Sequence, residues 1–202
     1  MGRLEVVVEE LFAVTFGYLV GSVPFAFVLA RRRGVDLRRA GSGNIGAANV
    51  LRTSGVGYGL ATVGLDAAKG AVAVLVAERL TGGPATPVAA GLASMIGHVY
   101  PVWLRFRGGK GVATAAGVFG VLAPMAVAIA GVVFVAAIWT TRYVSVGSMA
   151  AAGTLAAVAV ASDGPTGLSV GAVVAALIVL ERHRANLGRL VAGTERRIGQ
   201  RI

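Results

Sequence analysis

The residues best suited to chemistry gather in polar segments that favour anion binding. The first segment, residues 40–52, has glycines at 41, 43 and 46, which let backbone N–H groups approach an anion closely. Arg52 adds a planar guanidinium that matches phosphate. A dinucleotide-binding interpretation of this glycine spacing fails because no strand precedes it, and an ordinary flexible loop remains the alternative. Its candidate site residues are Ser42, Gly43, Asn44, Asn49 and Arg52.

A second segment, residues 97–114, places Gly-Gly-Lys-Gly directly before an apolar run. This order predicts backbone donors and an ammonium at a helix N-terminus, where anions are favoured. The segment resembles a nucleotide-binding P-loop only loosely, because Gly, not Ser or Thr, follows the lysine and no strand precedes it. The candidate residues are Gly108, Gly109, Lys110 and Gly111. The lone His98 is interpreted as a packing or capping residue.

The third segment, residues 181–195, carries His183 and Asn186 three positions apart, which predicts neighbours on one helical face. A basic tail held at the membrane surface explains the arginines of this segment but not the His/Asn pair. Neither histidine is followed five residues later by an aspartate, since positions 103 and 188 are Trp and Gly. With no cysteine, no acidic cluster and no Ser-His-Asp set, we expect neither a metal nor a cofactor.

Long apolar runs must position these segments. The chain of 202 residues is 56% hydrophobic and only 14% charged, against about a quarter in soluble domains. The runs do not alternate as barrel strands do, so they predict membrane-spanning helices. We therefore expect an all-α, polytopic membrane protein with residues 1–202 as a single domain. The predicted spans are 5–30, 58–80, 87–104, 113–140, 144–162 and 167–181.

Charge sets the topology of these spans. With the N-terminus outside, a single helix over 113–140 would place the arginine-rich tail outside, against the positive-inside rule. Splitting this run near Pro124 gives seven short helices and puts all three polar segments on the cytoplasmic face. The net charge of +10 then reflects cytoplasmic loops, and nucleic-acid binding is not expected. Asp66 and Lys69, three residues apart within a span, predict a mutually satisfied pair, with a role in lining the active site as the alternative.

The three segments, in this order, closely resemble the motifs of the acyl-phosphate:glycerol-3-phosphate acyltransferase (PlsY) family. The matching stretches are Gly-Ser-Gly-Asn-x-Gly-x-x-Asn-x-x-Arg, Gly-His-x-x-Pro with Gly-Gly-Lys-Gly-Val-Ala-Thr, and Arg-His-x-x-Asn-x-x-Arg-Leu-x-x-Gly-x-Glu. They cover the chain nearly from end to end. Ala48 departs from the threonine common in the family, at the cost of one hydroxyl contact.

The resemblance implies a multi-pass enzyme of the bacterial inner membrane that catalyses the first step of phospholipid biosynthesis. The 1-hydroxyl of sn-glycerol 3-phosphate would attack an acyl phosphate, which gives lysophosphatidic acid and phosphate. The implied partners are these two substrates, the lipid bilayer and a membrane-associated enzyme that makes acyl phosphate. A transporter of a phosphorylated small anion is the competing hypothesis.

By position, the resemblance implies roles for the candidate residues. Ser42, Arg52, Lys110, His183 and Asn186 would be catalytic, with Lys110 bridging both anions. Gly43, Asn44, Asn49, Gly108, Gly109, Gly111, Ser145 and Ser148 would bind substrate, and Glu195 would support the arginines. His183, Ser42 or the substrate's own phosphate could accept the hydroxyl proton, and the phosphate is favoured because no His–carboxylate pair is visible nearby.

Overall fold

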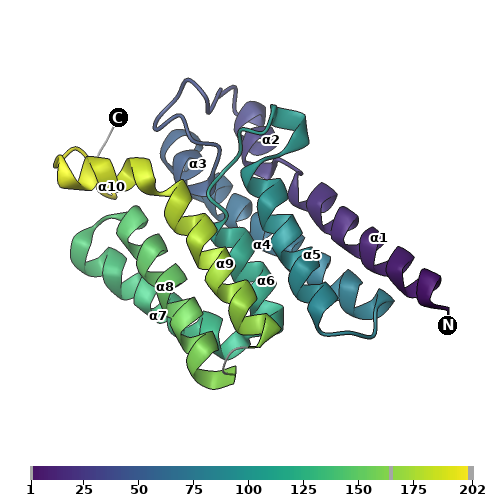
Figure 1. Cartoon of the computed structure of the whole chain (residues 1–202). Coiled ribbons are helices and arrows are strands. Elements are labelled where there is room, and N and C mark those ends of the chain that lie inside the picture. The colour runs from purple at the N-terminus through teal and green to yellow at the C-terminus, as the bar shows by residue number, and fades with distance from the viewer. Residues whose placement is uncertain (1, 164–165, 200–202) are drawn as a thin grey trace. The chain divides into compact units, whose positions relative to one another are not determined.

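The computed structural model describes residues 2–163 and 166–199, and it divides into two compact units, residues 1–122 and 123–202. The described residues are helical, with no strand among them. Figure 1 labels the helices along the chain. The first unit contains α1 (Arg3–Gly21), α2 (Phe25–Arg32), α3 (Ala47–Ser54), α4 (Val56–Leu80), α5 (Ala85–Val99), the 3₁₀ turn η1 (Val102–Leu104) and α6 (Val112–Leu122). The second contains α7 (Pro124–Thr141), α8 (Val144–Asp163), α9 (Gly167–Arg182) and α10 (Arg184–Val191).

Prolines set two of the helix boundaries. The predicted division of the run 113–140 is confirmed, because α6 ends at Leu122 and α7 begins at Pro124. The predicted span 5–30 is instead two helices, interrupted at residues 22–24. Pro24 has no N–H to donate within a continuous helix, so the chain breaks there and starts again at Phe25. This break leaves the Val23 carbonyl open to a side-chain donor.

Small residues let the helices of the first unit pack closely. Gly17 and Gly21 lie one turn apart on α1, against the backbone of Ala90 and Ser94 on α5. A Cβ atom at either glycine would overlap that backbone, so larger residues there would force the helices apart. This small-xxx-small pattern is typical of helices that associate within lipid. The same unit buries a small core of Ala26, Ala30, Leu37, Ile45, Val50 and Leu104 beneath the first polar segment.

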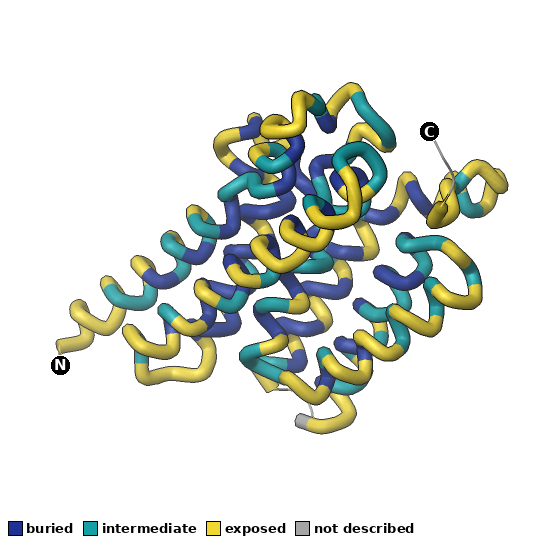
Figure 2. The backbone as a smooth tube through the Cα atoms, turned by 180° about the vertical axis from the view of Figure 1, so that it is seen from behind, coloured by how far each residue is buried: buried dark blue, intermediate teal, exposed yellow. Residues whose placement is uncertain are grey.

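Large apolar side chains on the outer helix faces are exposed, as expected for contact with lipid. Leu60 and Leu75 of α4 and Val132 and Trp139 of α7 are examples. In Figure 2 the first turns of α1, near the N-terminal label, are also exposed. Five candidate spans of 18 or more residues occur in the described chain. They are Arg3–Arg32, Val56–Leu80, Ala85–Leu104, Pro124–Thr141 and Val144–Ser162.

Within residues 2–163 and 166–199, the predicted segments 113–140 and 167–181 also contain the shorter helices α6 and α9. They are short, with 11 and 16 residues. At 1.5 Å per residue, α6 extends about 16 Å, roughly half of a hydrocarbon core. The segment 113–140 therefore holds one half-length and one full-length helix.

Candidate functional site

The first polar segment is organised around the buried side chain of Asn49. Its amide nitrogen donates to the carbonyls of Leu37, Ala40 and Asn44 at 3.3, 3.0 and 3.0 Å. Its amide oxygen accepts the N–H of Ser42 at 2.9 Å. Asn49 thus fixes the course of the loop from within α3. A direct contact between Asn49 and substrate stays a prediction, as do those of the other candidates.

The backbone of this loop turns through two glycines in the left-handed region, Gly41 at φ 61° and Gly43 at φ 73°. Side chains with a Cβ rarely adopt this conformation, so these positions favour glycine. The turns leave Ser42 exposed and Asn44 half-buried at the loop surface. Arg52 lies in the last turn of α3 and is also half-buried. The loop therefore presents a hydroxyl, an amide and a guanidinium from one short segment.

The second polar segment folds back onto the end of α5. The N–H groups of Gly108 and Gly109 donate to the carbonyls of Val99 and His98 at 3.0 and 3.1 Å. These bonds satisfy helix-end carbonyls that have no partner within the helix. The predicted anion donors at 108 and 109 are thus used to dock the loop. Lys110 is half-buried, and Gly111 at φ 82° leads directly into α6.

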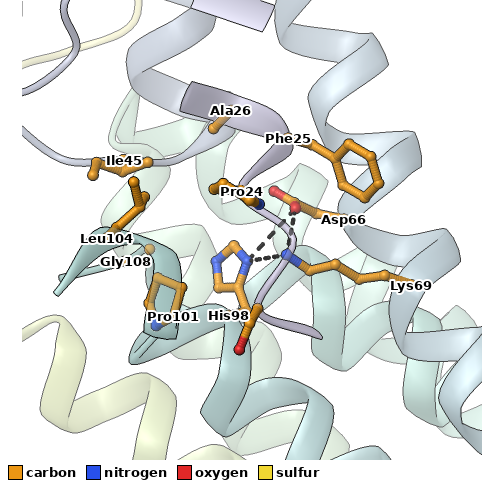
Figure 3. A pocket seen from close by; sticks show the side chains of 12 residues that line it. Pro24, Phe25, Ala26, Ile45, Asp66, Lys69, His98, Pro101, Leu104 and Gly108 are labelled. Carbon is orange, nitrogen blue, oxygen red and sulfur yellow. Dashed lines mark hydrogen bonds and ion pairs between the residues drawn. The ribbon is translucent and has the colours of Figure 1, made fainter. Parts of the chain in front are cut away.

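The first and second segments meet at Gly109. A Cβ atom on Gly109 would overlap the Nε2 atom of His98 and would lie close to the carbonyl oxygen of Ile45. The requirement for glycine is therefore steric, since two loops and a ring converge on this position. The two segments, some 60 residues apart in the sequence, are therefore in contact. Figure 3 shows Ile45, His98 and Gly108 around the same small cavity.

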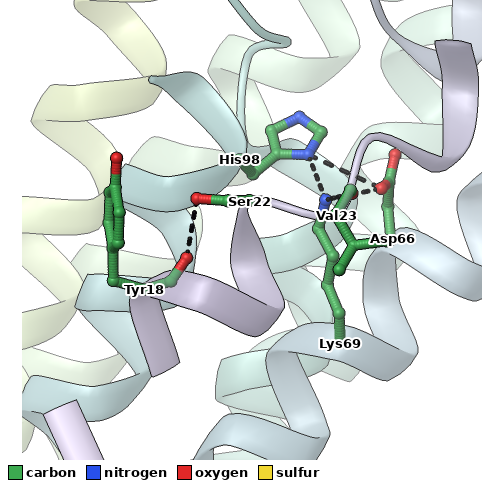
Figure 4. A network of polar contacts seen from close by, with 6 residues as sticks. All are labelled: Tyr18, Ser22, Val23, Asp66, Lys69 and His98. Carbon is green, nitrogen blue, oxygen red and sulfur yellow. Dashed lines mark hydrogen bonds and ion pairs between the residues drawn. The ribbon is translucent and has the colours of Figure 1, made fainter. Parts of the chain in front are cut away.

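A buried ion pair lies beside the glycine-rich loop. Lys69 and Asp66 of α4 pair at 2.8 Å, and both side chains are almost wholly buried. The Lys69 ammonium also lies 2.9 Å from Nδ1 of His98 and donates to the Val23 carbonyl at 3.1 Å. Figure 4 shows how α4, α5 and the break after α1 converge on this lysine. The predicted Asp66–Lys69 pair is confirmed, and His98, interpreted from the sequence as packing or capping, is its third member.

In the second unit, His183 lies at a break between helices. The sequence suggested one helical face for His183 and Asn186, but α9 ends at Arg182 and α10 begins at Arg184. The Nδ1 atom of His183 lies 2.8 Å from the Val179 carbonyl. A carbonyl only accepts, so Nδ1 carries a proton and the lone pair of a neutral ring is on Nε2. Both His183 and Asn186 are buried.

Glu195 organises the polar residues of the second unit. Its carboxylate accepts hydrogen bonds from Ser145 Oγ at 2.8 Å, Asn186 Nδ2 at 2.6 Å and Arg189 Nε at 2.7 Å. Burial by itself raises the pKa of this carboxyl group, but the three donors and the arginine charge outweigh it and leave the pKa lowered. The expected support of an arginine by Glu195 is confirmed. Its bonds to Ser145 and Asn186, 50 and 9 residues away, were not apparent from the sequence.

The remaining predicted residue of this unit, Ser148, donates to the Val144 carbonyl within α8. The tail is further held by the Ile198 N–H, which donates to the Arg142 carbonyl at 2.8 Å. Arg197 lies over the ring of Tyr143 and donates to its hydroxyl at 3.2 Å. With the Ser145–Glu195 bond, these contacts hold residues 195–198 against residues 142–145.

The chain is similar to known proteins over most of its length. A family model described as glycerol-3-phosphate acyltransferase matches residues 11–193. A glycerol-3-phosphate acyltransferase of Geobacter sulfurreducens is 46% identical over 189 residues, covering 94% of this chain and 97% of the relative. Another, from Shouchella clausii, is 42% identical over 202 residues, covering 96% and 98%.

Two solved structures are also similar. Both are crystal structures of PlsY, an integral membrane glycerol 3-phosphate acyltransferase, one in its glycerol 3-phosphate form and one in its lysophosphatidic acid form. The first has a TM-score of 0.90 at 40% identity and covers 94% of this chain and 96% of that chain. The second has a TM-score of 0.88 at 39% identity and covers 94% and 95%.

Proposed function

This chain belongs to the glycerol-3-phosphate acyltransferase family, and we propose that it uses acyl phosphate as its acyl donor. Glycerol 3-phosphate accepts the acyl group at its 1-hydroxyl, and the products are lysophosphatidic acid and inorganic phosphate. Family membership favours this reaction over anion transport. Residues 1–202 act together in it as one catalytic domain.

The observation that carries the proposal is the meeting of two anion-binding loops at Gly109. The loop of Ser42 and Arg52 and the loop of Lys110 come together at the start of α6. A helix N-terminus with an adjacent lysine favours a phosphate group. Because Gly108 and Gly109 dock the loop, we assign the phosphate to Lys110, Gly111 and the first turn of α6. Both substrates carry a phosphate, so a site rich in donors holds the reactants together.

The proposed reaction requires mainly that the protein hold its two substrates in the correct orientation. The hydroxyl oxygen of glycerol 3-phosphate attacks the acyl carbonyl carbon, the bond from that carbon to the phosphate oxygen breaks, and phosphate leaves with the electron pair. The hydroxyl proton passes to the departing phosphate. The donor is already activated, so catalysis comes from orientation and from cations that stabilise the developing negative charge. Ser42, Arg52, Lys110, His183 and Asn186 supply these contacts.

We further propose that the protein resides in a bacterial inner membrane with its site facing the cytoplasm. The positive-inside rule supports this orientation, since all basic residues except Arg3, Lys69 and Arg79 fall on that side of the seven-segment topology. An acyl phosphate is amphiphilic and hydrolytically reactive. Its supply by a membrane-associated enzyme therefore suits a site at the bilayer surface.

The test is donor selectivity. Purified protein in detergent is given glycerol 3-phosphate with palmitoyl phosphate, palmitoyl-CoA or palmitoyl-acyl carrier protein, in the presence of EDTA. We expect lysophosphatidic acid from palmitoyl phosphate alone, and a large loss of activity in Lys110→Met. Product formation only from the thioesters would refute the proposed donor. Uptake of glycerol 3-phosphate into proteoliposomes without acylation would support transport instead.

A further inference from the structure

The buried Lys69 is surrounded by one ion-pair partner and two hydrogen-bond partners. An ammonium has three N–H donors. Around Lys69 Nζ lie three acceptors, which are Asp66 Oδ1 at 2.8 Å, His98 Nδ1 at 2.9 Å and the Val23 carbonyl at 3.1 Å. The acceptors come from α4, α5 and the α1–α2 break (Figure 4). A fully paired charge explains how a lysine is retained inside a membrane helix.

This arrangement fixes the tautomer of His98. A proton on Nδ1 would point at the ammonium, so Nδ1 must accept and the ring proton must lie on Nε2. The alternative partner for a protonated Nδ1 is Asp66, but its oxygen is 3.6 Å away, which is too long for a hydrogen bond. His98 is therefore neutral, with Nε2–H on the edge of the ring opposite Lys69.

That edge of the ring faces the glycine-rich loop. A Cβ atom at Gly109 would overlap Nε2, so the ring and the loop backbone are in close contact. The backbone carbonyl of His98 also accepts the Gly109 N–H. One residue thus holds the loop through both its side chain and its main chain. The next residue along the loop is Lys110.

The space around the network is too small for a substrate. The cavity that Asp66, Lys69, His98 and Gly109 share has a volume of about 10 Å³, which is room for about one water molecule (Figure 3). The contacts that the network makes are therefore with the loop.

We propose that Asp66, Lys69 and His98 are positioning residues for the acyltransferase reaction. Lys69, paired with Asp66, holds His98 as the Nε2–H tautomer, and His98 fixes Gly108–Gly109 so that Lys110 and the first turn of α6 meet the substrate phosphate. This inference rests on the proposed function. A purely structural ion pair would affect only the stability of the protein. In the proposed role, loss of Nε2–H weakens substrate binding even when the stability is unchanged.

The test distinguishes the role of Nδ1 of His98 from that of its Nε2–H. In His98→Asn, the amide oxygen replaces Nδ1 and keeps the third acceptor of Lys69, but nothing replaces Nε2–H. We expect the melting temperature to stay near wild type while the KM for at least one phosphate substrate rises about tenfold and kcat changes little, as for lost ground-state binding. The matched control is Ser94→Ala, one turn earlier on α5 and equally buried, which should leave KM unchanged.

A second measurement does not depend on activity. In ¹⁵N-histidine spectra of the wild-type protein, assigned with His183→Gln, we expect His98 as the Nε2–H tautomer and His183 as a ring with Nδ1–H. An Nδ1–H or doubly protonated His98 would overturn the proposal. So would His98→Asn with unchanged melting temperature and unchanged KM for both substrates. Failure of the wild type to use acyl phosphate would refute the proposed donor alone, and the spectrum would still decide on His98.

Discussion

Glu195 offers the sharpest test of how the second unit is held together. In Glu195→Gln, the amide oxygen can still accept from Ser145 and Asn186, but the amide NH₂ then faces the N–H of Arg189. One charge-assisted hydrogen bond is lost, which in general is worth about 1.5–3 kcal/mol. Arg189 is 43% exposed and can turn to water, so we expect the lower end, about 1.5 kcal/mol.

Glu195→Ala removes all three bonds and leaves Ser145 and Asn186 buried without this acceptor. Loss of an acceptor from a buried donor costs about 1–3 kcal/mol, so the expected loss for the variant is about 3–5 kcal/mol. The control is Glu181→Gln. Glu181 also pairs with an arginine, Arg184 at 3.0 Å, but these side chains are 45% and 80% exposed. An exposed pair of this kind contributes at most about 0.5 kcal/mol.

The assay is reversible unfolding in mixed detergent–SDS micelles, followed by circular dichroism. The expected order of stability is wild type and Glu181→Gln together, then Glu195→Gln, then Glu195→Ala. Equal losses in the two Glu195 variants would mean that Ser145 and Asn186 do not depend on the carboxylate. A loss in Glu181→Gln as large as in Glu195→Gln would refute the importance of burial.

Glu195, His183 and the membrane topology each carry one further prediction. The pKa of Glu195 is lowered in the fold, so its contribution to stability is complete above the ordinary glutamate pKa of about 4.3 and is lost as pH falls through the folded pKa. On acidification, the free energy of unfolding in SDS should therefore fall more for wild type than for Glu195→Gln. Parallel pH profiles of the two proteins would contradict this. His183→Gln should mainly raise KM if phosphate accepts the proton, whereas a drop in kcat of about 10²–10⁴ in steady-state assays would identify His183 as the base. The chain lacks cysteine, and a Cβ atom at Gly82 or Gly188 would meet open space. An impermeant maleimide should therefore label Gly82→Cys from the periplasmic side and Gly188→Cys from the cytoplasmic side. The reverse pattern of labelling would refute the topology.

Local signals in the sequence were sufficient to predict the long apolar helices and some of their boundaries. Pro124 divides a long apolar run where the charge distribution required a division. Pro24 likewise divides the first predicted span, but the charge distribution does not require a division there. The short helix α3 within the first polar segment was also not expected, because the three glycines just before it, at 41, 43 and 46, are typical of a loop.

The site was predictable in composition but not in its internal bonding. Asn49 and Gly109 were expected to meet substrate, and the structure shows that one shapes its loop and the other fits between a ring and a neighbouring loop. Such roles depend on contacts between distant segments, as between Ser145 and Glu195. The buried Asp66–Lys69 pair was the one local sign of the larger network, since charges in a membrane helix require partners. His98 joins it only through the fold.

Direct acyl transfer from acyl phosphate to glycerol 3-phosphate can be followed with acyl phosphate that carries ¹⁸O in the oxygen bridging carbon and phosphorus. We predict one inorganic phosphate for each lysophosphatidic acid formed, with all of the ¹⁸O in the phosphate and none in the lipid. Retention of ¹⁸O in the lipid, or lysophosphatidic acid formed without equivalent phosphate, would show that the acyl group is not transferred in this way.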